Sequence, residues 1–197
     1  MFSKLVLFCG GPPIYAGLPK PLQMLRTGET LLERYLNHAN PSPSCEVVLL
    51  VEKDFESDYR SVVDNNDYSF RIQILVCSNA TSTLSKLYCF FDSGDLQDQT
   101  ILLTYPDIFV FGQLFCPNDL DERLSDHVFL SYIPISSRFP RLVVDPYNDA
   151  IRGISNHSGL IPANPLHVFG GHLICNHIFM RSLVQEFISQ ANISSSN

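Results

Sequence analysis

Short apolar runs alternate with helix-like patterns in the first half of the chain, and this alternation predicts an α/β fold. The apolar runs, which we expect to be strands, cover residues 5–9, 46–51, 70–77 and 101–103. The run at 46–51 is almost continuously apolar, as expected for a strand in a sheet that is covered on both faces. The alternation of such strands with helices therefore predicts an α/β fold with a covered sheet.

Helical spacing fills the segments between these runs. The first expected helix begins at Leu31, where Thr30 and Glu33 have the spacing of a capping box. The next two are marked by Phe55, Tyr59, Val62 and Val63, and by Leu84, Leu87, Tyr88 and Phe91. The second half predicts a strand at 129–135, a hairpin over 141–152, a strand at 167–175 and a helix from His177.

The first apolar run ends at Gly10 and Gly11, and a loop that contains Lys20 between Pro19 and Pro21 follows it. Glycines after a strand let the backbone approach a phosphate, and their N–H groups can hold an anion. A lysine on a proline-stiffened backbone adds a positive charge. This stretch predicts a phosphate-binding loop, although a tight turn without a ligand would have the same glycines.

Asp107 follows the apolar run at 101–103. A carboxylate at the carboxyl end of a central parallel strand lies on the side where open α/β sheets bind ligands. Mg²⁺ prefers one or two carboxylates together with substrate phosphates, so Asp107 is a candidate metal ligand. The alternative is that Asp107 caps the turn after the strand.

Ser82 and Thr83 stand where the run at 70–77 passes into a helix. Hydroxyl and N–H groups at the start of a helix favour anions and polar ligands. The two residues are therefore candidate nucleotide contacts. The alternative is that one of them only caps its own helix.

These segments together resemble the sugar-1-phosphate nucleotidyltransferases, a family with the nucleotide-diphospho-sugar transferase-like fold. The family opens with a strand, G-G-x-G-T-R, a loop, P-K-P-L and a helix that begins L-L-E. Gly10, Gly11, Lys20 and the segment 31–33 match this pattern. Pro13 and Tyr15 stand at or near the third glycine and the arginine of the family.

The resemblance implies a three-layer α/β/α, Rossmann-like mixed sheet, mainly parallel with one reversed strand near the carboxyl end. It also implies transfer of a nucleotidyl group from an NTP to a sugar 1-phosphate, with release of pyrophosphate. Gly10 and Gly11 would hold the triphosphate, and Lys20 and Asp107 would be catalytic, with Asp107 as the Mg²⁺ ligand. Ser82 and Thr83 would face the nucleotide.

Gly171 matches the glycine through which the family lets the sugar approach the backbone, so it is the candidate substrate-binding residue. The family's Glu-Lys pair, which holds the sugar phosphate, is absent, and 154–157 stands in its place. This departure leaves two alternatives open. One is a degenerate relative that binds a nucleotide or a sugar nucleotide without turnover, and the other is a glycosyltransferase with a related sheet.

Composition narrows the choice of partners. The chain has 197 residues, which fits one nucleotidyltransferase-like domain over 1–197, and 45% of its residues are hydrophobic. A net charge of -7 without basic clusters argues against a nucleic-acid partner.

No apolar stretch approaches the roughly 20 residues that cross a bilayer. Six scattered cysteines without a C-x-x-C pair indicate reduced thiols and a cytoplasmic location. The sequence leaves the oligomeric state open.

Overall fold

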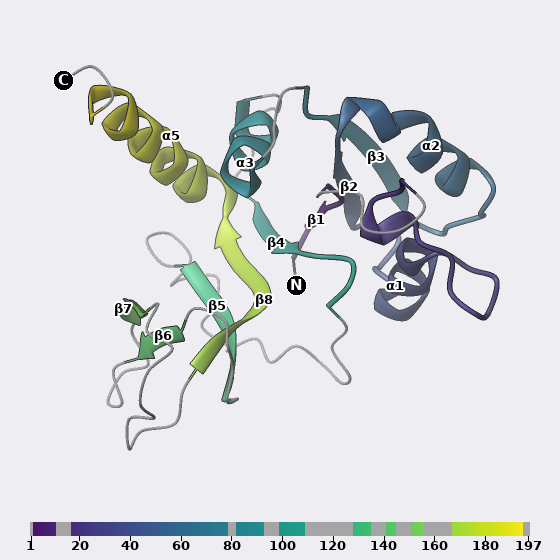
Figure 1. The fold of residues 1–197 in the computed structure, drawn as a ribbon, viewed down its shortest axis with the longest axis horizontal. Helices are drawn as coiled ribbons and strands as arrows, with labels where there is room; N and C mark the ends of the chain where they lie inside the picture. Colours follow the sequence, from purple (N-terminus) through teal and green to yellow (C-terminus); the bar gives the residue numbers. More distant parts are fainter. Residues whose placement is uncertain are drawn as a thin grey trace.

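The structure is a computed structural model. It describes residues 2–10, 17–78, 82–92, 99–108, 128–134, 141–144, 151–155 and 167–194. Its helices and strands, in chain order, are labelled in Figure 1.

Four parallel strands form the first part of the sheet. They are β1 (Lys4–Phe8), β2 (Glu46–Val51), β3 (Arg71–Val76) and β4 (Thr100–Thr104). Their order is β3-β2-β1-β4, so the first strand lies inside the block. Leu5 pairs with Val47 on one side and with Leu102 on the other. All four strands lie where the apolar runs predict them, and the prediction of a parallel block is confirmed.

The remaining strands extend the sheet beyond β4. They are β5 (Val128–Pro134), β6 (Arg141–Val144), β7 (Ile151–Ser155) and β8 (His167–Asn176). β8 is antiparallel to β4, β5 and β6, which makes it the reversed strand that the resemblance implies. β7 pairs antiparallel with β6 and therefore runs with β8, so the predicted hairpin is also confirmed and two strands are reversed.

Helices cover both faces of the parallel block. α1 (Leu31–Ala39) and α2 (Glu56–Asp64) pack on one face, and α3 (Thr83–Asp92) and α5 (His177–Ser194) pack on the other. Figure 1 shows α3 beside α5, and α1 and α2 together at the β2–β3 end of the molecule. Two short 3-10 turns, η1 (Lys20–Leu22) and η2 (Lys53–Phe55), follow β1 and β2. The three-layer prediction is confirmed.

The core has two halves that the pleat of β1 separates. Leu5 and Leu7 pack toward α1 and α2, whereas Val6 and Phe8 pack toward α3 and α5. Alternate residues of a strand point to opposite faces, so a strand covered on both sides is apolar throughout. β1 is such a strand, and the loop after it therefore begins from a buried strand whose position is fixed by packing on both faces.

A local signal fixes where α1 begins. The Thr30 hydroxyl accepts a hydrogen bond from the Glu33 N–H at 3.2 Å, and the Glu33 carboxylate accepts one from the Thr30 N–H at 2.5 Å. The predicted capping box is thus confirmed.

The face predicted for α3 is only partly right, because Tyr88 is 41% exposed whereas Lys86 is buried beside Phe90. A lysine therefore takes a position that the apolar pattern assigned to solvent.

α5 follows β8 and packs against α3 through Met180 and Val184. Its other side leaves Ile178, Leu183 and Phe187 exposed. Within the described parts of the chain, no helix is both long enough and apolar enough to cross a membrane.

Candidate functional site

The strand order identifies the edge of the sheet at which a ligand is expected. From β1 the chain continues outward to β2 and then β3 on one side, and β4 lies on the other side of β1. Open α/β sheets bind ligands outside the carboxyl ends of the strands at such a reversal. Gly10 follows β1 and Asp107 follows β4, so both lie at this edge.

Lys20 projects from a firmly held turn. Pro19, Pro21 and Leu22 are buried, and the Leu22 N–H donates to the Pro19 carbonyl at 3.0 Å. The Lys20 side chain is 54% exposed, and its ammonium donates to Asp107 Oδ2. Buried prolines fix the backbone while the charged end stays accessible. The structure thus brings together the two residues that the sequence nominates as catalytic, although 87 positions separate them.

Asp107 lies in a turn that the Ile108 N–H closes by donating to the Tyr105 carbonyl at 3.1 Å. Its side chain is 27% exposed. An ion pair with that much contact with water contributes little to stability. The pair is therefore better suited to change partners than to hold the fold together.

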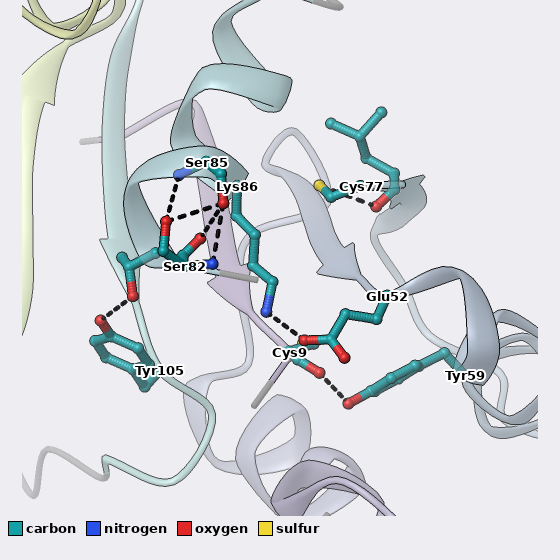
Figure 2. A network of polar contacts seen from close by, with 10 residues as sticks. Cys9, Glu52, Tyr59, Cys77, Ser82, Ser85, Lys86 and Tyr105 are labelled. Atoms are coloured by element: carbon teal, nitrogen blue, oxygen red, sulfur yellow. Dashed lines mark hydrogen bonds and ion pairs between the residues drawn. The ribbon is translucent and has the colours of Figure 1, made fainter. Parts of the chain in front are cut away.

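The start of α3 forms a second part of the site, which Figure 2 shows. The Ser82 hydroxyl accepts from the Ser85 N–H at 3.1 Å, and the Ser85 hydroxyl accepts from the Ser82 N–H at 3.0 Å. The Thr83 hydroxyl lies 3.4 Å from the Tyr105 hydroxyl, which joins the helix to the segment after β4. Ser82 thus caps its helix, and nucleotide contacts by Ser82 and Thr83 stay predictions.

A buried ion pair at the same edge was missed by the sequence reasoning. The Lys86 ammonium donates to Glu52 Oε1 at 2.7 Å, and the Lys86 side chain is 5% exposed whereas that of Glu52 is 30% exposed. A Cβ on Gly10 would collide with the Lys86 Nζ and would lie 2.7 Å from Glu52 Oε1. In Figure 2 the Lys86 side chain runs from α3 toward Glu52 and ends beside Cys9. Gly10 is therefore a glycine because an ammonium group lies against its backbone.

Cys9 and Tyr59 complete the buried surroundings of this turn. The Tyr59 hydroxyl donates to the Cys9 carbonyl, which fixes the backbone just before Gly10. Burial raises the pKa of the Cys9 thiol and of the Tyr59 hydroxyl far above their ordinary values. Both groups stay protonated at neutral pH, so we assign them structural roles and not the role of a nucleophile.

A weak signal in the sequence could have found Lys86. It lies four residues after Ser82, on the same side of the helix, in a segment whose other members up to Phe91 are uncharged. A lone charge inside an apolar helix is rarely buried unless it has a partner. Its partner is 34 positions away in the chain, and no local pattern connects the two residues.

Gly171 has a φ of +84°, a conformation that glycine adopts without strain. A Cβ at this position would collide with the Cδ1 atom of Ile108, the residue after Asp107. Ile108 thus fills the place that a side chain at position 171 would take. Sugar binding at Gly171 stays a prediction, and Gly11 lies outside the described residues.

The donors present fit a Mg²⁺ ion only if substrate supplies most of the ligands. In the described segments no three histidine, cysteine, aspartate or glutamate side chains gather as a metal site. Asp107 offers one partly exposed carboxylate at the end of β4. Mg²⁺ is commonly held by one or two carboxylates together with phosphate oxygens and water, so a single aspartate is compatible with that cofactor.

No protein-family profile and no curated protein matches this sequence. Solved structures, however, match its fold. One is 4-diphosphocytidyl-2C-methyl-D-erythritol synthase from Anaerococcus prevotii, with a TM-score of 0.60 and 13% identity over 95% of this chain and 75% of that one. Another is the inositol-1-phosphate CTP transferase of T. maritima, with a TM-score of 0.61 and 16% identity over 92% and 73% of the two chains.

A third match is a UDP-glucose pyrophosphorylase in complex with UDP-glucose, with a TM-score of 0.62 and 9% identity over 89% of this chain and 76% of that one. At such low identities the likeness shows the fold and no more. The chain therefore has the nucleotide-diphospho-sugar transferase-like fold that its opening motif implies.

Proposed function

We propose that this protein transfers a nucleotidyl group from an NTP to a sugar 1-phosphate or a similar phosphorylated small molecule, and releases pyrophosphate. The observation that carries the proposal is the pairing of Lys20 with Asp107 at the edge of the sheet where Gly10 follows β1. The fold supports it, because one matched structure is an inositol-1-phosphate CTP transferase and another is a UDP-glucose pyrophosphorylase.

In the reaction, an oxygen of the acceptor phosphate attacks the α-phosphorus of the NTP. The bond from that phosphorus to the bridging oxygen breaks, and pyrophosphate leaves with the electron pair. No covalent intermediate with the protein is needed, so the chain would act by positioning and by stabilising charge. Lys20 would neutralise negative charge on the phosphate oxygens, and the glycine turn would orient the triphosphate.

Asp107 would hold Mg²⁺ beside the same phosphates. Bound Mg²⁺ would supply a further positive charge to the phosphate oxygens. Since the Lys20 ammonium and the Asp107 carboxylate are paired with each other, substrate binding would exchange both partners. The ammonium would move to phosphate and the carboxylate to the metal, and this exchange keeps each charge compensated.

The proposal extends to the cellular role. We place the activity in the cytoplasm, a location that the free thiols among the described cysteines support. A nucleotide-linked sugar is the activated donor from which polysaccharides are built, so polysaccharide precursor synthesis is the role that we infer.

The test is pyrophosphate release, measured with each of the four common NTPs against a panel of sugar 1-phosphates in the presence of Mg²⁺. Release that needs both an NTP and one acceptor supports the proposal. The Lys20→Ala and Asp107→Ala variants should lose that release while keeping the melting temperature of the wild type. Wild-type release that persists in both variants would show that these roles are wrong.

One alternative is a relative that binds a nucleotide or sugar nucleotide without turnover. The sequence favours it at two places, since Tyr15 stands near the family's arginine and 154–157 replaces its Glu-Lys pair. Thermal stabilisation by an NTP with Mg²⁺ but no pyrophosphate release would select this alternative. Sugar transfer from a UDP-sugar without pyrophosphate would instead indicate a glycosyltransferase.

A further inference from the structure

The Lys86–Glu52 pair lies at an unusual place for a buried charge. Lys86 is 4% exposed and sits in a helix whose neighbouring buried side chains are Phe90 and Phe91. Among the residues that the structure describes, its ammonium has one hydrogen-bond partner, Glu52, at 2.7 Å. An ammonium has three N–H donors, so two of them have no partner within this part of the chain.

A buried ion pair is a poor way to stabilise a fold. Removing the Lys86 ammonium from water carries a desolvation cost that its attraction to a partly exposed carboxylate offsets only in part, and an apolar residue of similar volume often serves stability better. Lys86 has two possible roles. It either holds the fold together through its ion pair, which makes the pair a brace, or it serves the function of the site. The position of its ammonium against Gly10, at the first glycine of the proposed phosphate loop, favours a function.

The two partners differ in their contact with water. The Glu52 side chain is 30% exposed and that of Lys86 only 5%, so water screens the carboxylate more than the ammonium. The Lys86 ammonium is thus the less screened of the two charges that lie against Gly10. In a chain with a net charge of -7, a site for a polyanion needs such local positive charge.

We propose that Lys86 is a second cation of the phosphate-binding site, whose buried charge attracts polyphosphate across the Gly10 turn while Glu52 balances it. This inference rests on the proposed function, because it assumes that phosphate groups bind at that turn. It assigns a role to a residue of α3 that the opening motif does not contain. It also explains why an ion pair is placed against a glycine.

The two explanations differ in what they predict when each partner is neutralised in turn. If the pair is only a brace, Lys86→Met and Glu52→Gln should weaken binding alike. If the charge of Lys86 attracts phosphate, Lys86→Met should weaken binding and Glu52→Gln should keep or strengthen it. The signs differ because the glutamate charge opposes a bound anion.

The experiment is titration calorimetry of inorganic tripolyphosphate with Mg²⁺ into the wild type, the two single variants and the double variant Lys86→Met/Glu52→Gln. The dissociation constant should rise about tenfold in Lys86→Met, as expected for the loss of one charge-assisted interaction. The double variant should bind as weakly as Lys86→Met. It buries no unpaired charge, so it keeps the test available if Lys86→Met fails to fold.

The matched control is the Lys4–Glu46 pair, which joins the same kinds of side chain at 2.9 Å at the other edge of the sheet. The double variant Lys4→Met/Glu46→Gln should bind tripolyphosphate as the wild type does. Wild-type affinity in folded Lys86→Met, or equal losses in Lys86→Met and Glu52→Gln, would overturn the inference and leave the proposed function standing. A wild type that binds no tripolyphosphate would overturn both.

Discussion

The two edges of the parallel block carry their charges in different ways. At the amino edge, Lys4, Glu46 and Arg71 are the first residues of β1, β2 and β3 and stand in register across the sheet. The distances are 2.9 Å from Lys4 to Glu46 and 3.6 Å from Arg71 to Glu46. These pairs follow directly from the alignment of neighbouring strands.

At the carboxyl edge, the pairs join residues that no strand register aligns. Lys20 and Asp107 come from two connections, and Lys86 comes from a helix to meet Glu52 after β2. One of these pairs is accessible to water and the other is buried, and Gly10 lies against the buried one. Cross-strand pairing explains the charges of the first edge, whereas we attribute those of the second edge to the proposed binding of phosphate.

The largest expected effect is on activity. Asp107→Asn and Lys20→Met should each lower kcat/KM for pyrophosphate release by about 100- to 1,000-fold, since each removes charge stabilisation from the transition state. Both should unfold within a few degrees of the wild type, because the pair is exposed. Lys4→Met, at the amino edge, should leave kcat/KM unchanged. An equal loss of kcat/KM in Lys4→Met would show that the charges of the carboxyl edge have no special role in the reaction.

The next effect is on stability at Gly10. Gly10→Ala should lower the free energy of unfolding by about 1–3 kcal/mol, because the methyl group would displace the Lys86 ammonium. Denaturant unfolding measures this value. The double variant Gly10→Ala/Lys86→Ala should lose less than the sum of the two single losses, since the smaller side chain leaves room. Additive losses would mean that the two residues do not compete for space.

A smaller effect is expected from pH at the amino edge. His177 is 2% exposed, stacks on Phe90 at 5.5 Å, and has no hydrogen-bond partner on either ring nitrogen within the described residues. Burial, with the charges of Lys4 and Arg181, lowers the pKa of His177 below its ordinary value of 6.5. Below pH 6.5, His177 therefore binds a proton more readily in the unfolded chain than in the folded chain.

This contribution to stability is complete above pH 6.5 and declines as the pH falls, by at most about 1.4 kcal/mol per pH unit. Melting temperatures between pH 7.5 and 5.5 should show the decline. His177→Phe, which keeps an aromatic ring against Phe90 and Phe91, should make the dependence shallower. A variant with the slope of the wild type would assign the acid sensitivity to other groups.

The smallest effect is expected from the amino-edge ion pair. Lys4→Met should change the free energy of unfolding by less than about 1 kcal/mol, because both partners remain in contact with water. Salt should reduce the difference between the variant and the wild type. A larger loss that salt does not affect would point to packing of the Lys4 chain on the Phe90 ring, which the ammonium approaches to 5.9 Å.

The strands and the first helix could be predicted because their signals are local. β2 has the limits that its apolar run indicates, and α1 begins where Thr30 and Glu33 form their capping box. Lys20 and Asp107 could be nominated because each follows a strand whose carboxyl end is recognisable. Their contact could be expected from topology once both strands were placed in one sheet.

The buried half of the site could not be predicted in this way. Lys86 interrupts an apolar pattern, and the sequence reasoning placed the buried face of α3 through Tyr88 instead. Likewise, Ile108 covers Gly171 because two strands meet in tertiary structure, and neither residue signals that contact locally. Hydrophobic periodicity predicts which elements form, but it does not show which side chains close the gaps between them.

The position of β4 has a consequence for synthesis on the ribosome. β4 pairs on one side with β1, which precedes it in the chain, and on the other side with residues 172–176 of β8, which follow it. Because domains fold as the nascent chain emerges, at about 5–20 residues per second, the backbone of β4 waits several seconds with one row of N–H and C=O groups unpaired. During that interval the strand is a natural binding site for a chaperone and a starting point for aggregation.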